Sequence, residues 1–388
     1  VKTGDFTAVA GEGYFVNTTS GEIDVTLPAG SAGDVVAVAD YANTADTNNI
    51  ILKQNGSDKI EGSTDDFTIN QEGAALTIVF VDSTKGWIIT DTGNSSDAFV
   101  AGAYSADFLV IAGGGGAGYD QGGGGGAGGY RASYNSEASG GGGSSETSLT
   151  FNPGIVYTVT VGSGGAGING VTNPAGEGND SVISGADITT VTSIGGGRGG
   201  NYNQPSYGAS TGGSGGGGAG GSPAGLAGAA GTANQGYAGG SSTGAVSTGT
   251  GGGAVGVNST SVNPGAGGAG VASTITGSSV TRGGGGGSMT ASSPYTTSPG
   301  GAGGGGAGSN VTGASSPPGN PGTANTGGGG GGIWNLSAPG VSGSGGSGVV
   351  ILRVPTLRYS GTTTGSPTVT TNGSDTIITF NASGDYTG

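Results

Sequence analysis

The feature that most constrains the fold of this chain is its glycine content, 99 of 388 residues, most of it gathered into runs between Gly113 and Gly348. The usual share of glycine in a protein is only about 7%. A glycine run has no side chains to bury, and glycine loses more backbone entropy on folding than any other residue. Such runs either stay flexible linkers or fold through hydrogen bonds between their own backbones.

The first glycine run has the form of a nucleotide site. The stretch 108–118, FLVIAGGGGAG, places an apolar segment before Gly113, Gly115 and Gly118, which satisfy the dinucleotide fingerprint G-x-G-x-x-G. That site needs a helix after the third glycine, because the helix N-terminus holds the phosphates. Here YDQ and five more glycines follow, and the chain has no P-loop motif. We therefore predict no nucleotide and no other cofactor.

We predict instead that the runs form polyglycine II, extended left-handed helices with three residues per turn that pack side by side. Amides of one helix can then donate to carbonyls of the next. Collagen is excluded because a strict G-X-Y period is absent and the chain has only 14 prolines. The alanines and serines within the runs, as in GGGGAGG (215–221), fit runs that have some outward-facing positions. Flexible linkers are the alternative, but they would not require the apolar segments FLVIA, YTVTV and VVILRV beside them.

The predicted fold class is all-β with irregular glycine-rich structure and essentially no α-helix, since no helical periodicity of useful length occurs. Residues 1–90 are expected to form a β-sandwich-like domain or a meander. The alternation in 22–27 places Ile23, Val25 and Leu27 on one face of a strand. The other predicted strands of this domain, each bounded by turn-forming residues, are 14–18, 34–39, 49–53, 67–70, 76–82 and 87–90.

The remaining chain divides into three parts. Residues 91–107 are predicted to be a linker, 108–354 a packed polyglycine II domain on a β scaffold, and 355–388 a C-terminal β-hairpin segment. Hairpins are expected at 149–161 and 181–194. FLVIA and VVILRV, the most apolar segments flanking the glycines, are expected to pair in one sheet. In the last part, an Asn-Gly turn at 372–373 joins two strand-like segments.

Charge and composition exclude several classes of function. The formal net charge is −15, and residues 1–111 carry 16 acidic and 4 basic residues, which disfavours nucleic acid as a partner. The absence of His and Cys removes the usual zinc, haem and triad arrangements, and no segment is long and apolar enough for a membrane helix. The DTGNSSD segment (91–97) offers oxygens but does not fit a calcium loop, so no metal site is predicted.

Four segments carry a resemblance to a known family: FLVIAGGGGAG, YTVTVGSGGAG after an Asn-Pro-Gly turn, SVISGADITTVTSIGGGRGG and GSGVVILRV. Together they resemble the glycine-rich domain of bacteriophage tail-fibre proteins, including the polyglycine-sandwich adhesin at the tip of long tail fibres. The first part is similar to small β domains of tail-fibre proteins. The resemblance implies an extracellular, virion-borne protein that assembles with other tail-fibre subunits, as a homotrimer, and binds a bacterial surface receptor, a glycan or an outer-membrane protein.

In such adhesins the polyglycine core is a rigid rack whose end loops touch the receptor. The resemblance therefore directs attention to the aromatic and basic residues in the polar insertions between glycine runs. These are Tyr119, Tyr130, Arg131, Tyr134, Tyr202, Tyr207, Tyr295 and Trp334. Aromatic rings offer a flat apolar face for a sugar ring, and Tyr and Trp add a hydrogen-bonding group. The alternative for each ring is that it merely covers the edge of the glycine stack.

Two other classes of function remain open from the sequence. A structural extracellular filament or an ice-binding polyglycine bundle would use the same core without a cellular receptor. A glycan-cleaving enzyme would need paired carboxylates. The acidic residues of the middle region show no motif that pairs them, so we predict no catalytic residues and no enzymatic activity. These acids are Asp120, Glu137, Glu146, Glu177, Asp180 and Asp187.

Overall fold

The computed structural model describes residues 1–93, 103–221, 225–244, 248–256, 265–289, 298–309, 317–334 and 340–388. Within these ranges the chain is all-β, as predicted, and no helix is long and apolar enough to cross a membrane. The strands of the first domain are β1 (Phe6–Thr7), β2 (Glu12–Val16), β3 (Ile23–Thr26), β4 (Val35–Asp40), β5 (Ile50–Lys53), β6 (Phe67–Ile69), β7 (Ala75–Asp82) and β8 (Gly86–Thr92).

The first domain is a two-sheet sandwich whose chain path differs from a meander. Its sheets have the orders β1-β3-β5-β6 and β2-β4-β7-β8. The first five strands alternate between the sheets, so β1, β3 and β5 are parallel neighbours, as are β2 and β4. Only the later pairs β5–β6, β4–β7 and β7–β8 are antiparallel. The alternation that predicted each strand says nothing of which strand lies beside it.

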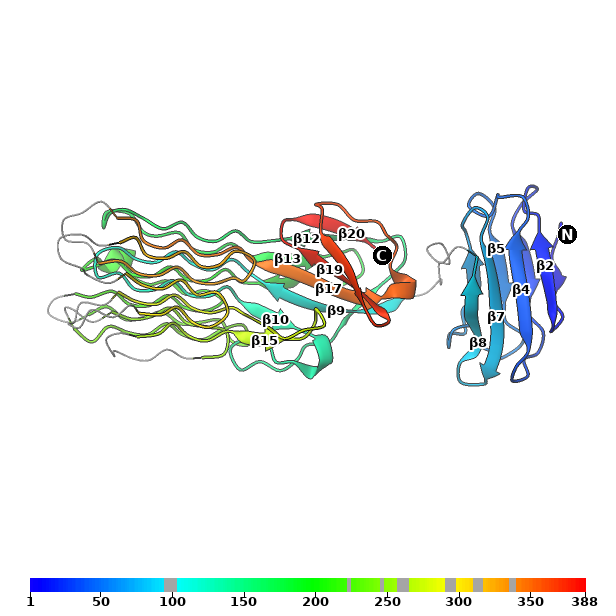
Figure 1. The fold of residues 1–388 in the computed structure, drawn as a ribbon, viewed down its shortest axis with the longest axis horizontal. Coiled ribbons are helices and arrows are strands. Elements are labelled where there is room, and N and C mark those ends of the chain that lie inside the picture. Colours follow the sequence, from blue (N-terminus) through cyan, green and yellow to red (C-terminus); the bar gives the residue numbers. More distant parts are fainter. Residues whose placement is uncertain are drawn as a thin grey trace.

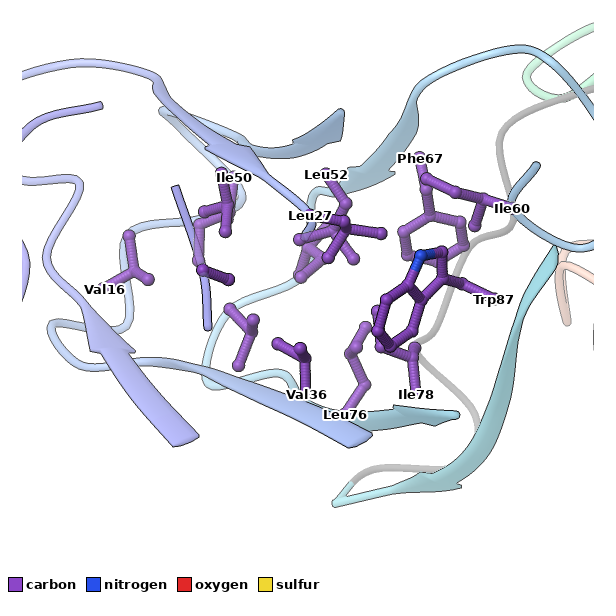
Figure 2. Close-up of a cluster of buried hydrophobic side chains, with 14 of the residues drawn as sticks. Val16, Leu27, Val36, Ile50, Leu52, Ile60, Phe67, Leu76, Ile78 and Trp87 are labelled. Carbon is purple, nitrogen blue, oxygen red and sulfur yellow. The ribbon is translucent and has the colours of Figure 1, made fainter. Parts of the chain in front are cut away.

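The core of this domain is made of side chains from both sheets. Alternate residues of the strands point inward, and Figure 2 shows Leu27, Leu52 and Phe67 of one side facing Val36, Leu76 and Ile78 of the other. Trp87 is fully buried, and its ring meets Phe80 edge to face at 5.6 Å between centroids. The domain is therefore held by conventional apolar burial.

Twelve further strands lie in the described part of the glycine-rich region. They are β9 (Tyr104–Ile111), β10 (Tyr130–Ala132), β11 (Leu149–Phe151), β12 (Val156–Thr160), β13 (Ser181–Ser184), β14 (Val191–Ser193), β15 (Val271–Ser273), β16 (Val280–Arg282), β17 (Val349–Pro355), β18 (Thr368–Asn372), β19 (Asp375–Phe380) and β20 (Gly384–Thr387). Three single-turn 3-10 helices accompany them, at Tyr134–Ser136, Pro205–Tyr207 and Thr356–Arg358.

The main scaffold sheet has the order β10-β9-β17-β19-β18, with β11 also on β9. FLVIA and VVILRV pair as predicted, because β9 and β17 run antiparallel with Phe108 opposite Leu352. From Phe108 onward β9 is buried on both faces, as is β17 up to Val354, which explains the continuous apolar sequence of these segments. A second sheet, β14-β13-β12-β20, packs beside it, so the last segment contributes to both sheets through β19 and β20. The hairpin predicted at 181–194 is confirmed by the β13–β14 pair, but the one predicted at 149–161 is wrong, because β11 pairs with β9 while β12 pairs with β13 and β20.

The scaffold strands continue directly into the glycine runs (Figure 1). The run 112–118 leaves β9, and the run 122–129 returns to β10. In the same way 162–168 leaves β12, 175–179 returns to β13, and 194–201 leaves β14. Strand and polyproline-type backbones are close in dihedral space, so the chain passes from one to the other without a turn.

Amides of the run 112–118 donate to three different neighbours with a period of three. Residues 112, 115 and 118 donate to the run 122–129; residues 113 and 116 donate to 175–179; residues 114 and 117 donate to 341–348. These N···O distances lie between 2.9 and 3.1 Å. Carbonyls of the same run accept from three more neighbours, 162–168, 194–201 and 327–334. Six laterally bonded neighbours and a three-residue period confirm the polyglycine II prediction.

The run 122–129 is surrounded in the same way. Its amides donate in rotation to 327–334, 194–201 and 248–254, and its carbonyls accept from 112–118, 212–221 and 283–289. None of the glycines in these two runs has a positive φ, in keeping with left-handed extended backbone. The interior of this region is therefore a lattice of backbone hydrogen bonds, which offsets the entropy lost by ordering glycine.

The contacts of this lattice explain the fingerprint at the start of the first run. A Cβ added to Gly113 or Gly115 would lie 2.0 or 2.2 Å from a carbonyl oxygen of a neighbouring run, and one on Gly118 would lie still closer to another. The glycines are required for close packing of backbones. No helix follows them, because residues 122–129 form the next extended run.

The expectation of outward-facing alanines and serines holds for only part of the runs. Ser163, Ala166 and Ala227 are exposed, whereas Ala117, Ala127 and Ala219 are fully buried, and Ser342 is almost so. The Ser342 hydroxyl donates to the carbonyl of Ala117 and accepts from the amide of Ile168. A small side chain thus fits between runs wherever a neighbour leaves room or offers a partner.

Candidate functional site

The glycine runs turn at two ends. Because 112–118, 162–168 and 194–201 all lead away from scaffold strands, their far ends meet at the end opposite the sheets, here called the distal end (Figure 1). Its described turns are 119–121, 169–174 and 202–208. The chain between 119 and 208 therefore visits the distal end three times, at positions far apart in sequence.

Asn201 ties these three turns together. Its side-chain oxygen accepts from the amide of Tyr119 at 3.1 Å, and its side-chain nitrogen donates to the carbonyl of Asn173 at 2.8 Å and reaches that of Val171 at 3.4 Å. The side chain is completely buried. A buried amide with its donors and its acceptor all used fixes the relative positions of the turns. The sequence offered no signal for this role beyond an Asn at the end of a glycine run.

Four of the aromatic residues predicted from the sequence lie at this distal end and are half-buried: Tyr119, Tyr202, Tyr207 and Trp334. The amide of Tyr202 donates to the carbonyl of Tyr119 at 3.2 Å, so these two residues are adjacent. Tyr207 closes the 3-10 helix Pro205–Tyr207, and its carbonyl accepts from the amide of Asn201. Each ring keeps part of its surface exposed while its backbone is fixed.

Trp334 lies at the distal end of the run 327–334, where its amide donates to the Ser309 hydroxyl at 3.2 Å. The preceding residue, Ile333, accepts from the amide of Gly122, which follows the first distal turn. Trp334 thus belongs to the same end as Tyr119. Tyr295 lies outside the described residues.

Gln121 is a polar distal residue that the sequence reasoning missed. It follows Asp120 in the first distal turn, where both residues have positive φ, 50° and 48°. Gln121 is only 5% exposed, and its side-chain oxygen has no hydrogen-bond partner among the described residues. Aside from Asp120, the described distal turns contain no charged residue. The surface that they form is aromatic, amide-rich and close to neutral.

The structure places the other three candidates at the scaffold end. Tyr130 begins β10 opposite Ile111, has no exposed surface and belongs to the core beneath the sheet. Burial raises the pKa of its hydroxyl. A ring with no exposed surface cannot contact a receptor, so Tyr130 is not part of the site. It packs instead with Leu109, Ala254 and Ile351 in that core.

Arg131 and Tyr134 have structural partners. Arg131 forms an ion pair with Glu146 through two nitrogens, one of them Nε at 2.8 Å from Oε1, and donates to the carbonyl of Thr192 at 3.1 Å. Tyr134 lies against the guanidinium of Arg353, 4.6 Å from ring centroid to Cζ. These contacts join loops to the scaffold and lie far along the runs from the distal turns.

The carboxylates of the glycine-rich region are also engaged individually. Glu177 pairs with Arg198 at 2.6 Å, and Asp187 accepts from Tyr157 and Asn152, which lowers the pKa of its carboxyl against the effect of its desolvation. Glu137 accepts from Thr274, and Asp180 from the amide of Gly195. Within the described ranges, no group of three or more acidic residues could hold a metal ion. Of the segment 91–97, only residues 91–93 are described.

Comparison with known protein families shows to which family this chain belongs. A family model described as a glycine-rich domain matches residues 90–355, more than half of the chain and all of the laterally bonded runs. This protein belongs to the glycine-rich domain family. The comparison with curated proteins gave no match. The matched range begins in β8 and ends with β17, so the glycine-rich domain includes the scaffold strands that feed its runs.

Proposed function

We propose that this glycine-rich domain protein is a receptor-binding component of a bacteriophage tail fibre. In this proposal the chain works outside the cell as part of the virion, is joined to other fibre subunits, and attaches to a glycan or an outer-membrane protein of the host. Attachment uses the aromatic residues of the distal end and involves no catalysis.

The observation that carries the proposal is the convergence of aromatic residues at one end of a rigid lattice. Tyr119, Tyr202, Tyr207 and Trp334 come from three separate turns or run ends, and the fully buried Asn201 holds two of those turns in register. A structural filament has no need to order polar loops at its tip. A binding surface does, because preorganised groups lose less entropy when a ligand binds.

The chemistry of the distal end suits a sugar-rich or polar surface. Half-buried Tyr and Trp rings present large contact areas with few rotatable bonds, and neighbouring amides supply donors and acceptors. Against catalysis, the acidic residues at the scaffold and along the runs are each bound to their own partner. Glycoside hydrolysis would require two carboxyl groups facing one substrate.

Binding of the fluorescently labelled full chain to a panel of bacterial strains tests the proposal. We expect saturable, strain-selective binding. A variant carrying Tyr119→Ala, Tyr202→Ala, Tyr207→Ala and Trp334→Ala should lose it while keeping the wild-type melting temperature. Tyr134→Ala, an aromatic truncation at the scaffold end, is the matched control and should bind normally.

Three results would contradict the proposal. Equal binding by the quadruple variant would remove the distal end as the site, and loss of binding in Tyr134→Ala alone would move the site to the scaffold. Binding to no strain, together with self-assembly or altered ice growth, would favour a structural filament or an ice-binding bundle. Release of sugar from host polysaccharide would show that the protein is an enzyme.

A further inference from the structure

A polar pocket lies at the scaffold end of the runs, beside β10 (Figure 1). Its volume of about 560 Å³ is in the range of pockets that hold small ligands. Three segments that are far apart in sequence form it: β10, the loop 139–146 and the turn 233–235. No aromatic residue is among the described lining residues, which distinguishes this pocket from the distal end. Its polar lining residues are Arg131, Ser139, Ser144, Glu146, Asn234 and Gln235.

The walls of this pocket are held in place by hydrogen bonds to the scaffold. The side-chain oxygen of Gln235 accepts from the amide of Ile194, which follows β14, at 2.8 Å. The Ser139 hydroxyl, only 3% exposed, accepts from the amide of Ala132 in β10 at 3.0 Å and donates to Glu146 at 3.3 Å. The pocket is therefore ordered before a ligand arrives, which lowers the entropic cost of binding.

The charged groups of the pocket neutralise each other. Arg131 and Glu146 form the two-nitrogen ion pair described above, and each side chain is 25% exposed. A charged ligand could pair with one of these groups only by separating it from the other, which would leave a partly buried charge uncompensated. The pocket therefore favours a ligand without charge.

The same residues keep hydrogen-bonding capacity for a ligand. A guanidinium has five N–H donors, and within the described part of the chain Arg131 uses two on Glu146 and one on the carbonyl of Thr192. Two N–H groups of Arg131 are left, and the exposed side chains of Asn234 and Ser144 add both donors and acceptors. The hydroxyl groups of a sugar, each of them a donor and an acceptor, match this set.

We propose that this pocket binds a neutral sugar, at a site separate from the aromatic distal end. A hexose has several neighbouring hydroxyl groups and no charge, so it can bond to Arg131, Glu146 and Asn234 without separating the ion pair. Because no aromatic ring is available to stack on the sugar, hydrogen bonds hold it, and the affinity should be weak, in the millimolar range. This inference does not depend on the function proposed for the distal end.

Saturation-transfer difference NMR of the full chain with glucose, galactose and mannose tests this site. We expect saturable binding of at least one of these hexoses. Asn234→Gly should weaken that binding about ten-fold, because it removes the side-chain amide but keeps a backbone with φ of 60°, which glycine adopts easily. The matched control is Asn135→Gly. Asn135 is exposed, has φ of 49° and lies outside the pocket, so its replacement should leave sugar binding unchanged.

A second variant fills the pocket. Ser144→Trp places a large ring there from an exposed position, so it should abolish sugar binding, and an unchanged melting temperature would show that the domain stays folded. Binding of none of the three hexoses would overturn the proposal, as would binding that neither Asn234→Gly nor Ser144→Trp weakens. Tighter binding of acetate or of an amino acid than of any hexose would overturn it in favour of a charged ligand.

The quadruple distal variant distinguishes this site from the one proposed for the distal end. If that variant alone lost hexose binding, the sugar would lie at the distal end. That result would overturn this inference and would leave the proposed function standing. Hexose binding that is lost in Asn234→Gly and Ser144→Trp, in a protein that binds no bacterial strain, would support the pocket and contradict the proposed function.

Discussion

The first domain and the glycine-rich domain are stabilised by different interactions. In the first, inward side chains such as Trp87, Leu52 and Ile78 meet between two sheets, and each strand bonds through its backbone to its neighbours in its own sheet. In the second, the runs 112–118 and 122–129 have almost no side chains, and each bonds to six neighbours through its backbone. One region is held by apolar burial and the other by a three-dimensional hydrogen-bond lattice.

This difference determines which substitutions each region tolerates. An apolar core accepts replacements of similar volume, because neighbouring side chains can repack. A lattice of backbones has nothing that can repack, since the atoms facing Gly115 or Gly125 are carbonyl groups of other runs. The two regions should therefore respond differently to changes of equal size, and the following measurements examine that difference.

The largest effect is expected for Gly115→Ala. The new Cβ would lie 2.2 Å from the carbonyl oxygen of Gly197, so two runs must separate and lose lateral bonds. We expect the glycine-rich domain to lose more than about 4 kcal/mol of stability, measured by calorimetry, with the first domain's transition unchanged. Gly170→Ala, with no atom within 4 Å of its Cβ, is the control and should be nearly neutral. Equal melting temperatures for Gly115→Ala and Gly170→Ala would contradict the close packing of backbones in the lattice.

Trp87→Ala should have the next largest effect, and only on the first domain. The side chain is fully buried, so truncation should destabilise that domain by about 3–5 kcal/mol. Trp87→Phe should be milder, because it keeps an aromatic ring and the indole nitrogen has no hydrogen-bond partner among the described residues. Calorimetry resolves the domains. A matching shift of the glycine-rich transition would show that the regions are not independently stabilised.

Asn201→Ala should loosen the distal end without melting the lattice. It removes the partner that Asn201 supplies to the part-buried amide of Tyr119 and to the carbonyl of Asn173, which corresponds to about 1–3 kcal/mol. Hydrogen exchange should accelerate in 119–121, and binding to cells should weaken. Asn201→Asp keeps the acceptor for Tyr119 but loses the donor to Asn173, so its effect on 119–121 should be smaller. Unchanged hydrogen exchange in 119–121 in both variants would show that Asn201 does not fix the positions of the distal turns.

The smallest expected effect is a loss of stability at alkaline pH, and it concerns the scaffold of the glycine-rich domain. Burial raises the pKa of Tyr157 to about 12, and its hydrogen bond to Asp187 adds to the rise while the amide of Asn152 opposes it. The unfolded chain releases this proton near pH 10, so the stabilising contribution is complete below pH 10 and is lost between about pH 10 and 12. Denaturation of Tyr157→Phe across that interval should show a shallower pH slope than wild type. Equal pH slopes of stability for Tyr157→Phe and wild type would contradict a raised pKa of Tyr157 in the folded state.

The sequence predicted elements better than it predicted neighbours. Alternation located the strands of the first domain, and the apolar segments FLVIA and VVILRV predicted the β9–β17 pair. The alternation of apolar and polar residues could not show that β1, β3 and β5 are parallel. Reversing the direction of a strand leaves its inward and outward residues unchanged. For the glycine runs, composition predicted the helix type. Identical runs carry no information on which of them are adjacent.

The candidate site was predictable only as a set of residue types. Position between glycine runs selected the four described aromatic residues at the distal end, but it selected Tyr130 on the same ground. Tyr130 is buried because the run 122–129 ends at the scaffold and not at the tip. Asn201 and Gln121 were missed because an amide acquires its role only when the turns around it meet.

The three-residue period of the lattice has a consequence for how such a chain can change its length. Inserting one residue within a run turns every later amide by about 120° and directs it at the wrong neighbour. Only insertions of three residues restore the directions, and each then moves the rest of the run by about 9 Å along its axis. The length of a run can therefore change only by multiples of three residues, because the directions of its amides repeat every three residues. Insertions and deletions of any other size can accumulate only in the loops, so variation in length is directed to the ends of the molecule.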